Sequence, residues 1–125
     1  MILAIDFDGT IVEDKFPGIG NERRNAGYYI NKLYKEGYFI IIWSSRIGKR
    51  LEEAKQWLDD RNISYNTINE SCPANLEVFL GIDTRKIHAD MYIDDKGLDK
   101  IPEWDEIYEK VHCRLPTLED TGFPG

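Results

Sequence analysis

Two apolar runs and two mixed stretches with strand-forming residues, separated by longer amphipathic segments, set the pattern of the chain. The apolar runs cover residues 2–5 and 38–43, and the mixed stretches cover residues 65–68 and 89–93. Apolar runs of this length, bounded by polar or turn-forming residues, are typical of strands buried on both faces of a parallel sheet. The pattern therefore predicts four strands, the second of them central.

Three segments with helical spacing accompany these runs. Apolar side chains recur every three or four positions in residues 22–36 and 49–61, as expected for helices with one buried face. A last helix is predicted from Pro102, because proline suits a first helical turn. Its apolar positions are Trp104, Ile107, Tyr108 and Val111.

Other stretches lack such a pattern. Residues 13–20 contain Pro17 and two glycines and predict a loop or small flap after the first strand. Residues 69–81 predict a loop with one or two helical turns at residues 76–80. The tail from about residue 114 has no period, and we expect its end to be loose.

Alternating strands and helices predict an α/β fold, a three-layer Rossmann-like arrangement around a central parallel sheet. A length of 125 residues predicts one domain over residues 1–125. The carboxyl ends of parallel strands share one edge, which is where ligands bind in open α/β sheets. Polar residues that follow the apolar runs should gather there, namely Asp6, Asp8, Ser44, Asp94 and Asp95.

Composition narrows the functional classes. The 16 Lys and Arg against 23 Asp and Glu give a net charge of −7, which argues against broad binding to nucleic acid or anionic membranes. No run approaches the roughly 20 apolar residues of a membrane span, and Asp6 and Asp8 interrupt the first run too early for a signal peptide. Cys72 and Cys113 share no metal-ligand spacing. We therefore expect free thiols and a cytoplasmic protein.

The predicted cluster has the chemistry of a metal and phosphate site. Carboxylates gathered at one edge repel each other unless a cation or shared protons hold them. Oxygen ligands without His or Cys favour Mg²⁺. A Ser44 hydroxyl and, if it reaches the edge, the Lys86 ammonium would complete a site for a phosphate group. The plainer interpretations are an Asp-Gly turn, a serine that caps a helix, and a surface lysine.

The chain resembles the small, capless phosphatases of the haloacid dehalogenase (HAD) superfamily. The resemblance lies in four motifs in the family's order: an Asp-x-Asp-x-Thr run after the first strand, a strand ending in Ser, a Lys, and a strand ending in two acids. In this chain they are Asp6-Phe7-Asp8-Gly9-Thr10, Ser44, Lys86 and Asp94-Asp95. Ser45 competes for the second motif, although the Ser-x-Arg run through Arg46 favours Ser44, and Lys96 and Lys100 are alternatives for the third.

The resemblance implies an Mg²⁺-dependent phosphomonoester hydrolase with an aspartyl-phosphate intermediate. Asp6 would attack phosphorus, and Asp8 would act as general acid and then general base. Mg²⁺ would bind Asp6, the backbone carbonyl of Asp8, and the pair Asp94 and Asp95, with Asp95 favoured as the direct ligand. Ser44 and Lys86 would hold the phosphoryl oxygens.

The short flap leaves no room for a sizeable cap domain, so the resemblance implies an open site for a phosphorylated substrate. Open sites in the superfamily often take large substrates or are closed by a neighbouring subunit, which makes a homo-oligomer possible. Two alternatives remain. One is a phosphorylation-switched receiver domain, which places its acid pair first and its phosphorylated Asp mid-chain, the reverse of the order here. The other is a catalytically silent HAD-like binding module.

Overall fold

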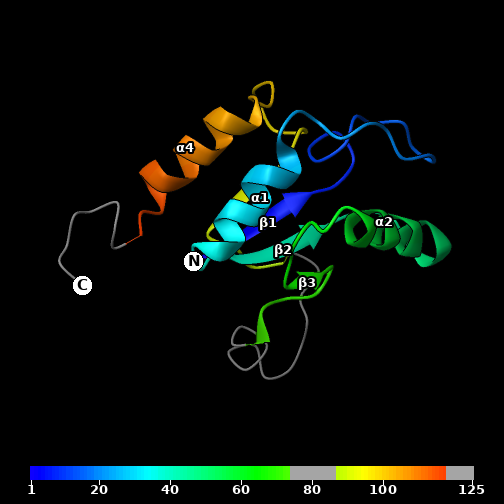
Figure 1. Ribbon diagram of the computed structural model, residues 1–125, viewed down its shortest axis with the longest axis horizontal. Helices are drawn as coiled ribbons and strands as arrows, with labels where there is room; N and C mark the ends of the chain where they lie inside the picture. Colours follow the sequence, from blue (N-terminus) through cyan, green and yellow to red (C-terminus); the bar gives the residue numbers. More distant parts are fainter. Residues whose placement is uncertain (74–86, 118–125) are drawn as a thin grey trace.

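A parallel sheet forms the centre of the molecule in the computed structural model, which describes residues 1–73 and 87–117 (Figure 1). Its strands are β1 (Ile2–Asp6), β2 (Phe39–Trp43), β3 (Thr67–Ile68) and β4 (Met91–Ile93). The strand order is β3-β2-β1-β4, and every pair is parallel. The predicted α/β class with a parallel sheet is therefore confirmed, and β1 lies inside the sheet between β2 and β4.

Helices α1 (Ala26–Lys35), α2 (Gly48–Asp60) and α4 (Trp104–Arg114) pack on one face of this sheet. A single apolar cluster joins alternate strand residues to the helices. The strand residues are Leu3, Ile5, Ile40, Ile42, Met91 and Ile93, and the helix residues include Ile30, Leu33, Trp57, Leu58, Trp104 and Val111. Helix α4 contacts α1, and α1 crosses in front of β1 in Figure 1.

The opposite face of the sheet is also buried where Ala4 and Ile41 lie, with 2% and 0% exposure. A strand covered on both faces explains why residues 2–5 and 38–43 are continuously apolar rather than alternating. The third layer stays a prediction, because most of the connection between β3 and β4 lies outside the described residues.

The first predicted helix begins later than its apolar spacing suggests, at Ala26 rather than at residue 22. Glu22 forms an isolated antiparallel bridge with Val12, and the Arg23 N–H donates to the Ile11 carbonyl at 2.8 Å. Asn25, just before the helix, has a left-handed φ of 62°. Residues 22–25 therefore close the flap onto the loop after β1 instead of adding a helical turn.

Two strands are shorter than predicted because side chains replace part of their ladders. The Asn66 Oδ1 accepts a hydrogen bond from the Ile40 N–H at 2.7 Å, just before β3. The Asp90 Oδ2 accepts one from the Ile2 N–H at 2.6 Å, just before β4. Each side-chain oxygen takes the place of a strand carbonyl, so each strand begins two residues later than predicted, at Thr67 and Met91.

Several predicted features fall within residues 74–86 and 118–125. The helical turns predicted at residues 76–80, the predicted phosphate-binding Lys86 and most of the tail lie outside the described residues. Cys72 and Cys113 are free thiols, as expected. Among the described helices, none has the length and apolar character needed to cross a membrane.

Candidate metal and phosphate site

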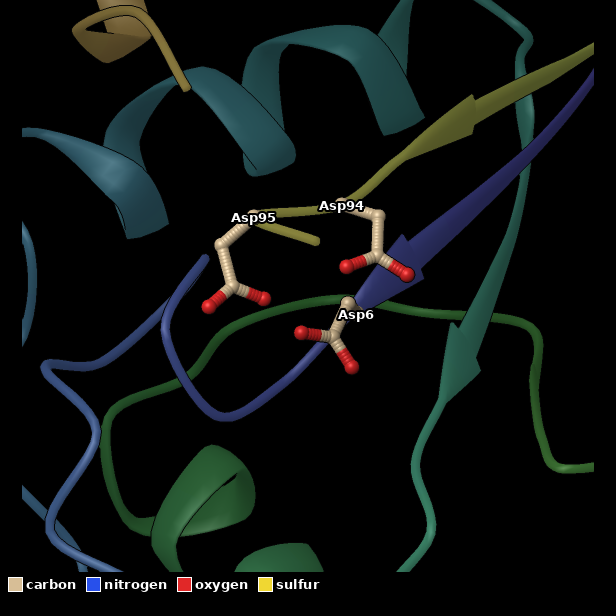
Figure 2. Close-up of side chains that lie close together, drawn as sticks. All are labelled: Asp6, Asp94 and Asp95. Carbon is tan, nitrogen blue, oxygen red and sulfur yellow. The ribbon is translucent and has the colours of Figure 1, made fainter. Parts of the chain in front are cut away.

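Three carboxylates converge at the carboxyl edge of the sheet. Asp6 is the last residue of β1, and Asp94 and Asp95 directly follow β4. The register pairs Ile5 with Ile93, so the residues that follow lie beside each other. Asp6, Asp94 and Asp95 each offer an oxygen within 4.8 Å of the others, and their side chains point into a common space (Figure 2). We call these three residues the acidic triad.

The triad is electrostatically strained when nothing positive lies between its members. The pKa of Asp6 is raised to about 8, first by burial, then by a hydrogen bond with Asp95 and by the negative charges of Asp94 and Asp95. The Thr10 hydroxyl, which donates to Asp6 Oδ2 at 3.3 Å, acts in the opposite direction. A shared proton or a bound cation is therefore needed to hold the three groups together.

The triad fits a hard divalent cation. Its donors are all carboxylate oxygens, the ligands that Mg²⁺ prefers. Asp95 Oδ1 is buried and has no hydrogen-bond partner among the described residues. Lys96 Nζ lies 3.7 Å from Asp95 Oδ2, but its side chain is 75% exposed, and an exposed ion pair of this kind contributes little. A cation would satisfy both the orphaned oxygen and the excess charge.

The turn after β1 brings the backbone close to the triad. The Phe7 carbonyl accepts N–H groups from the next turn, including that of Ile11 at 3.0 Å. Gly9 has a φ of +87°, and a Cβ there would lie 2.1 Å from Asp95 Oδ2. Only glycine combines this left-handed conformation with so close an approach. The buried Trp104 Nε1 of α4 donates a hydrogen bond to the Thr10 carbonyl at 2.9 Å, so the turn is held against α4.

Asp8 lies outside the acidic triad and is held by Arg46. Arg46 Nε donates to Asp8 Oδ2 at 2.7 Å, and Arg46 Nη2 donates to Asp8 Oδ1 at 2.8 Å. The Arg46 side chain is fully buried, and these hydrogen bonds raise its pKa further above the ordinary arginine value. Asp8 therefore offers the triad no side-chain oxygen, which leaves its predicted metal contact to the backbone carbonyl.

Arg46 also holds the flap. Its guanidinium donates to the carbonyls of Pro17 at 3.1 Å and Gly18 at 2.7 Å, and it lies over the rings of Phe7 and Phe16. One buried side chain thus joins Asp8 to residues of the predicted flap. The sequence pattern gave Arg46 no role beyond favouring Ser44 through the Ser-x-Arg run, so sequence reasoning missed this contact at the candidate site.

The two candidate serines occupy different positions. The Ser44 Oγ accepts a hydrogen bond from the Arg46 N–H at 3.0 Å, and the Ser44 N–H donates to Asn69 Oδ1 at 2.8 Å. Ser45 is exposed and lines an open cavity of about 390 Å³. The described cavity wall carries Ser45 and not Ser44, although the sequence favours Ser44.

The cavity brings together most of the predicted site. Its lining contains the acidic triad, Asp8 and Lys96, one of the alternatives to Lys86. The remaining wall is Asp14, Phe16, Trp43 and Ser45. An apolar wall next to a few convergent polar groups is typical of a small-molecule site.

These features define a small α/β protein with an acidic cluster at the carboxyl edge of a parallel sheet. The chain is similar to a solved structure described as the conserved protein coded by locus from Bacteroides thetaiotaomicron, with 38% identity and a TM-score of 0.82 over 97% of this chain and 96% of the other. The chain belongs to the family of that conserved protein. No family model matches the chain, and neither does any curated protein.

Proposed function

We propose that this protein is an Mg²⁺-dependent phosphomonoester hydrolase of the HAD type that works through an aspartyl-phosphate. The observation that carries the proposal is the convergence of Asp6, Asp94 and Asp95 within 4.8 Å, beside Asp8 on the same cavity wall. The residues match the first and fourth motifs of the HAD resemblance, and they lie at the ends of two neighbouring strands. The similarity to the conserved protein gives no information about activity, so the proposal depends on this site.

Mg²⁺ would be held by carboxylate oxygens of Asp6, Asp94 and Asp95 and by the backbone carbonyl of Asp8. When bound, it would neutralise the triad and the charge of the phosphoryl group. It would also favour the ionised form of Asp6, whose raised pKa otherwise keeps that carboxyl protonated near neutral pH. Activity should therefore depend on the cation.

In the first half-reaction, a carboxylate oxygen of Asp6 forms a bond to phosphorus while the ester P–O bond breaks. Asp8 gives its proton to the departing oxygen, which leaves as an alcohol. In the second half-reaction, Asp8 takes a proton from water, the water oxygen bonds to phosphorus, and the Asp6–phosphorus link breaks. The products are inorganic phosphate and free Asp6 carboxylate.

Arg46 suits the acid–base role of Asp8 by fixing its orientation. The two bonds occupy one acceptor site on each Asp8 oxygen, and a carboxylate has about four such sites. A proton can therefore still bind and leave Asp8 while Arg46 holds it. Ser45 or Ser44 and Lys86 or Lys96 are the candidate donors to the phosphoryl oxygens.

The direct test is release of phosphate from an aryl phosphate with and without Mg²⁺. We expect Mg²⁺-dependent turnover by the wild type and none by Asp6→Asn, because an amide is a poor nucleophile and a poor metal ligand. Asp99→Asn is the matched control: Asp99 is exposed and is absent from the cavity lining. Wild-type-like turnover by Asp6→Asn would remove Asp6 from the mechanism.

A further inference from the structure

We infer that the substrate of this site is a phosphate monoester whose leaving group carries a flat aromatic ring, as aryl and nucleoside monophosphates do. The inference rests on the proposed function and deepens it, because it concerns the part of the cavity that the reacting groups do not use. It follows from the two aromatic side chains that line the cavity and from its charge.

Phe16 and Trp43 line the cavity on the same side of the molecule as Asp6 and Asp8. Trp43 ends β2, one strand away from the nucleophile on β1, and is half-buried. Phe16 belongs to the flap and is 58% exposed. Within the described part of the chain, neither ring pairs with another aromatic ring, whereas Phe7 packs edge-on against Trp57 at 5.7 Å.

Phe16 is exposed but held in position. The Arg46 guanidinium lies over its ring, 5.0 Å from the centroid, and also binds the carbonyls of Pro17 and Gly18 that follow it. One side of the ring is thus backed by a fixed cation, while more than half of the residue remains open to solvent. A ring presented in this way can stack on a ligand with little loss of side-chain freedom.

The charges that line the cavity restrict the charge that the leaving group of the substrate can carry. Asp14 adds a further carboxylate to those of the reacting groups, and the described lining offers one cation, Lys96, which is mostly exposed. A bound Mg²⁺ and one or two donors can balance a single phosphate. A second phosphate on the leaving group would face Asp14 with no described partner, so a neutral ring that can donate hydrogen bonds to Asp14 fits better.

Binding of two non-hydrolysable phosphonates tests the inference without turnover. Benzylphosphonate carries a flat ring, and cyclohexylmethylphosphonate carries a puckered ring with the same number of carbons. Titration calorimetry with Mg²⁺ should show that the wild type binds the benzyl compound about two- to tenfold more tightly, the preference expected from aromatic pairing beyond surface burial. Phe16→Leu should remove most of this preference, and Phe16→Tyr should retain it.

Tyr28→Leu is the matched control, since Tyr28 is 61% exposed on α1 and lies outside the cavity lining; it should keep the preference. Equal affinity for the two phosphonates in the wild type, or an unchanged preference in Phe16→Leu, would overturn the inference while leaving the proposed phosphatase intact. Failure of both phosphonates and of inorganic phosphate to bind would overturn the inference and the phosphate site together. Ring-selective binding without hydrolysis of any aryl phosphate would overturn the proposed reaction, and with it the assignment of the ring to a leaving group.

Discussion

At the scale of single residues, Asp6 links the electrostatics of the site to its chemistry. Its carboxyl lies beside two others, and without a cation its pKa rises to about 8 from the ordinary value of 3.8. The same crowding that makes Asp6 unfavourable as an anion makes the triad a strong candidate for a cation. Stability and metal binding should therefore depend on pH through this residue.

We expect the metal-free protein to lose stability as pH rises from about 4 to about 8. In that range folded Asp6 keeps a proton that the unfolded chain has lost, so the folded state binds more protons and raising the pH disfavours it. Mg²⁺ should cancel this loss by binding the ionised carboxylates. Thermal unfolding across this range, with EDTA and with Mg²⁺, measures both effects.

Asp6→Asn should flatten the pH dependence in EDTA, because the titrating group is gone, whereas the exposed-site variant Asp99→Asn should retain it. A wild-type curve in EDTA that has the same slope as that of Asp6→Asn would contradict the assigned pKa shift and its cause.

The pair that follows β4 gives a second prediction at this scale. Replacing Asp94 and Asp95 together by Asn should weaken Mg²⁺ binding and activity, and excess Mg²⁺ should restore part of the activity. Without metal the double variant should be at least as stable as the wild type, because two like charges leave a crowded site. Metal titration and thermal unfolding in EDTA are the measurements. An unchanged metal dependence would show that Asp94 and Asp95 form only a turn and do not bind the cation.

At the scale of elements, the flap and the second strand meet through Arg46. The residue follows β2 by three positions, yet its side chain binds Asp8 after β1 and the carbonyls of Pro17 and Gly18. The loops after two neighbouring strands are thereby joined by one buried guanidinium. This arrangement orients Asp8 and fixes Phe16 at the cavity.

Arg46→Lys should reduce kcat more than it changes KM, because lysine keeps the charge but cannot form the two-pronged contact that orients Asp8. It should also lower the free energy of unfolding by about 1.5–3 kcal/mol, the range for hydrogen bonds to charged groups. Steady-state kinetics and denaturant unfolding check the two effects. Arg50→Lys is the control, since Arg50 is half exposed and pairs with Glu53 on the surface of α2. If Arg46→Lys changed kcat and stability no more than Arg50→Lys does, Arg46 would not be the residue that positions Asp8.

The elements themselves were largely predictable because apolar runs and helical spacing report burial directly. What the pattern could not show is where side chains replace backbone pairing. Asn66 and Asp90 shorten two strands, and the bridge between Val12 and Glu22 delays α1. These are contacts between residues distant in sequence, and a local pattern contains no signal for them.

The candidate site was predictable to the extent that strand ends determine it. Asp6, Asp94 and Asp95 meet because neighbouring parallel strands end at one edge, which the alternation of elements already implies. The partner of Asp8 was missed, because nothing in the local sequence shows that Arg46 turns toward it. The choice between Ser44 and Ser45 also depends on a turn that the pattern does not resolve: the structure places Ser45 on the cavity wall.

At the scale of the whole molecule, the three described helices pack on one face of the sheet, and an open cavity lies at its carboxyl edge. The apolar cluster extends from β4 through β1 and β2 to the three described helices, and Trp104 of α4 reaches the turn that carries Gly9 and Thr10. The packing thus holds the carboxyl edge of the sheet in place. In the proposed reaction, the open cavity at this edge would receive the phosphate ester.

In the proposed reaction, Asp6 carries the phosphoryl group and Asp8 completes its removal. The most direct measurement is the intact mass of Asp8→Asn after exposure to an aryl phosphate and Mg²⁺. With a good leaving group Asp6 can still attack, but hydrolysis of the intermediate should slow by about 10²- to 10⁴-fold, the usual contribution of general acid–base catalysis. We predict a mass increase of one phosphoryl group, absent from Asp6→Asn, with Mg²⁺ binding retained because the Asp8 side chain lies outside the acidic triad. Loss of Mg²⁺ binding with no trapped phosphate would contradict the account.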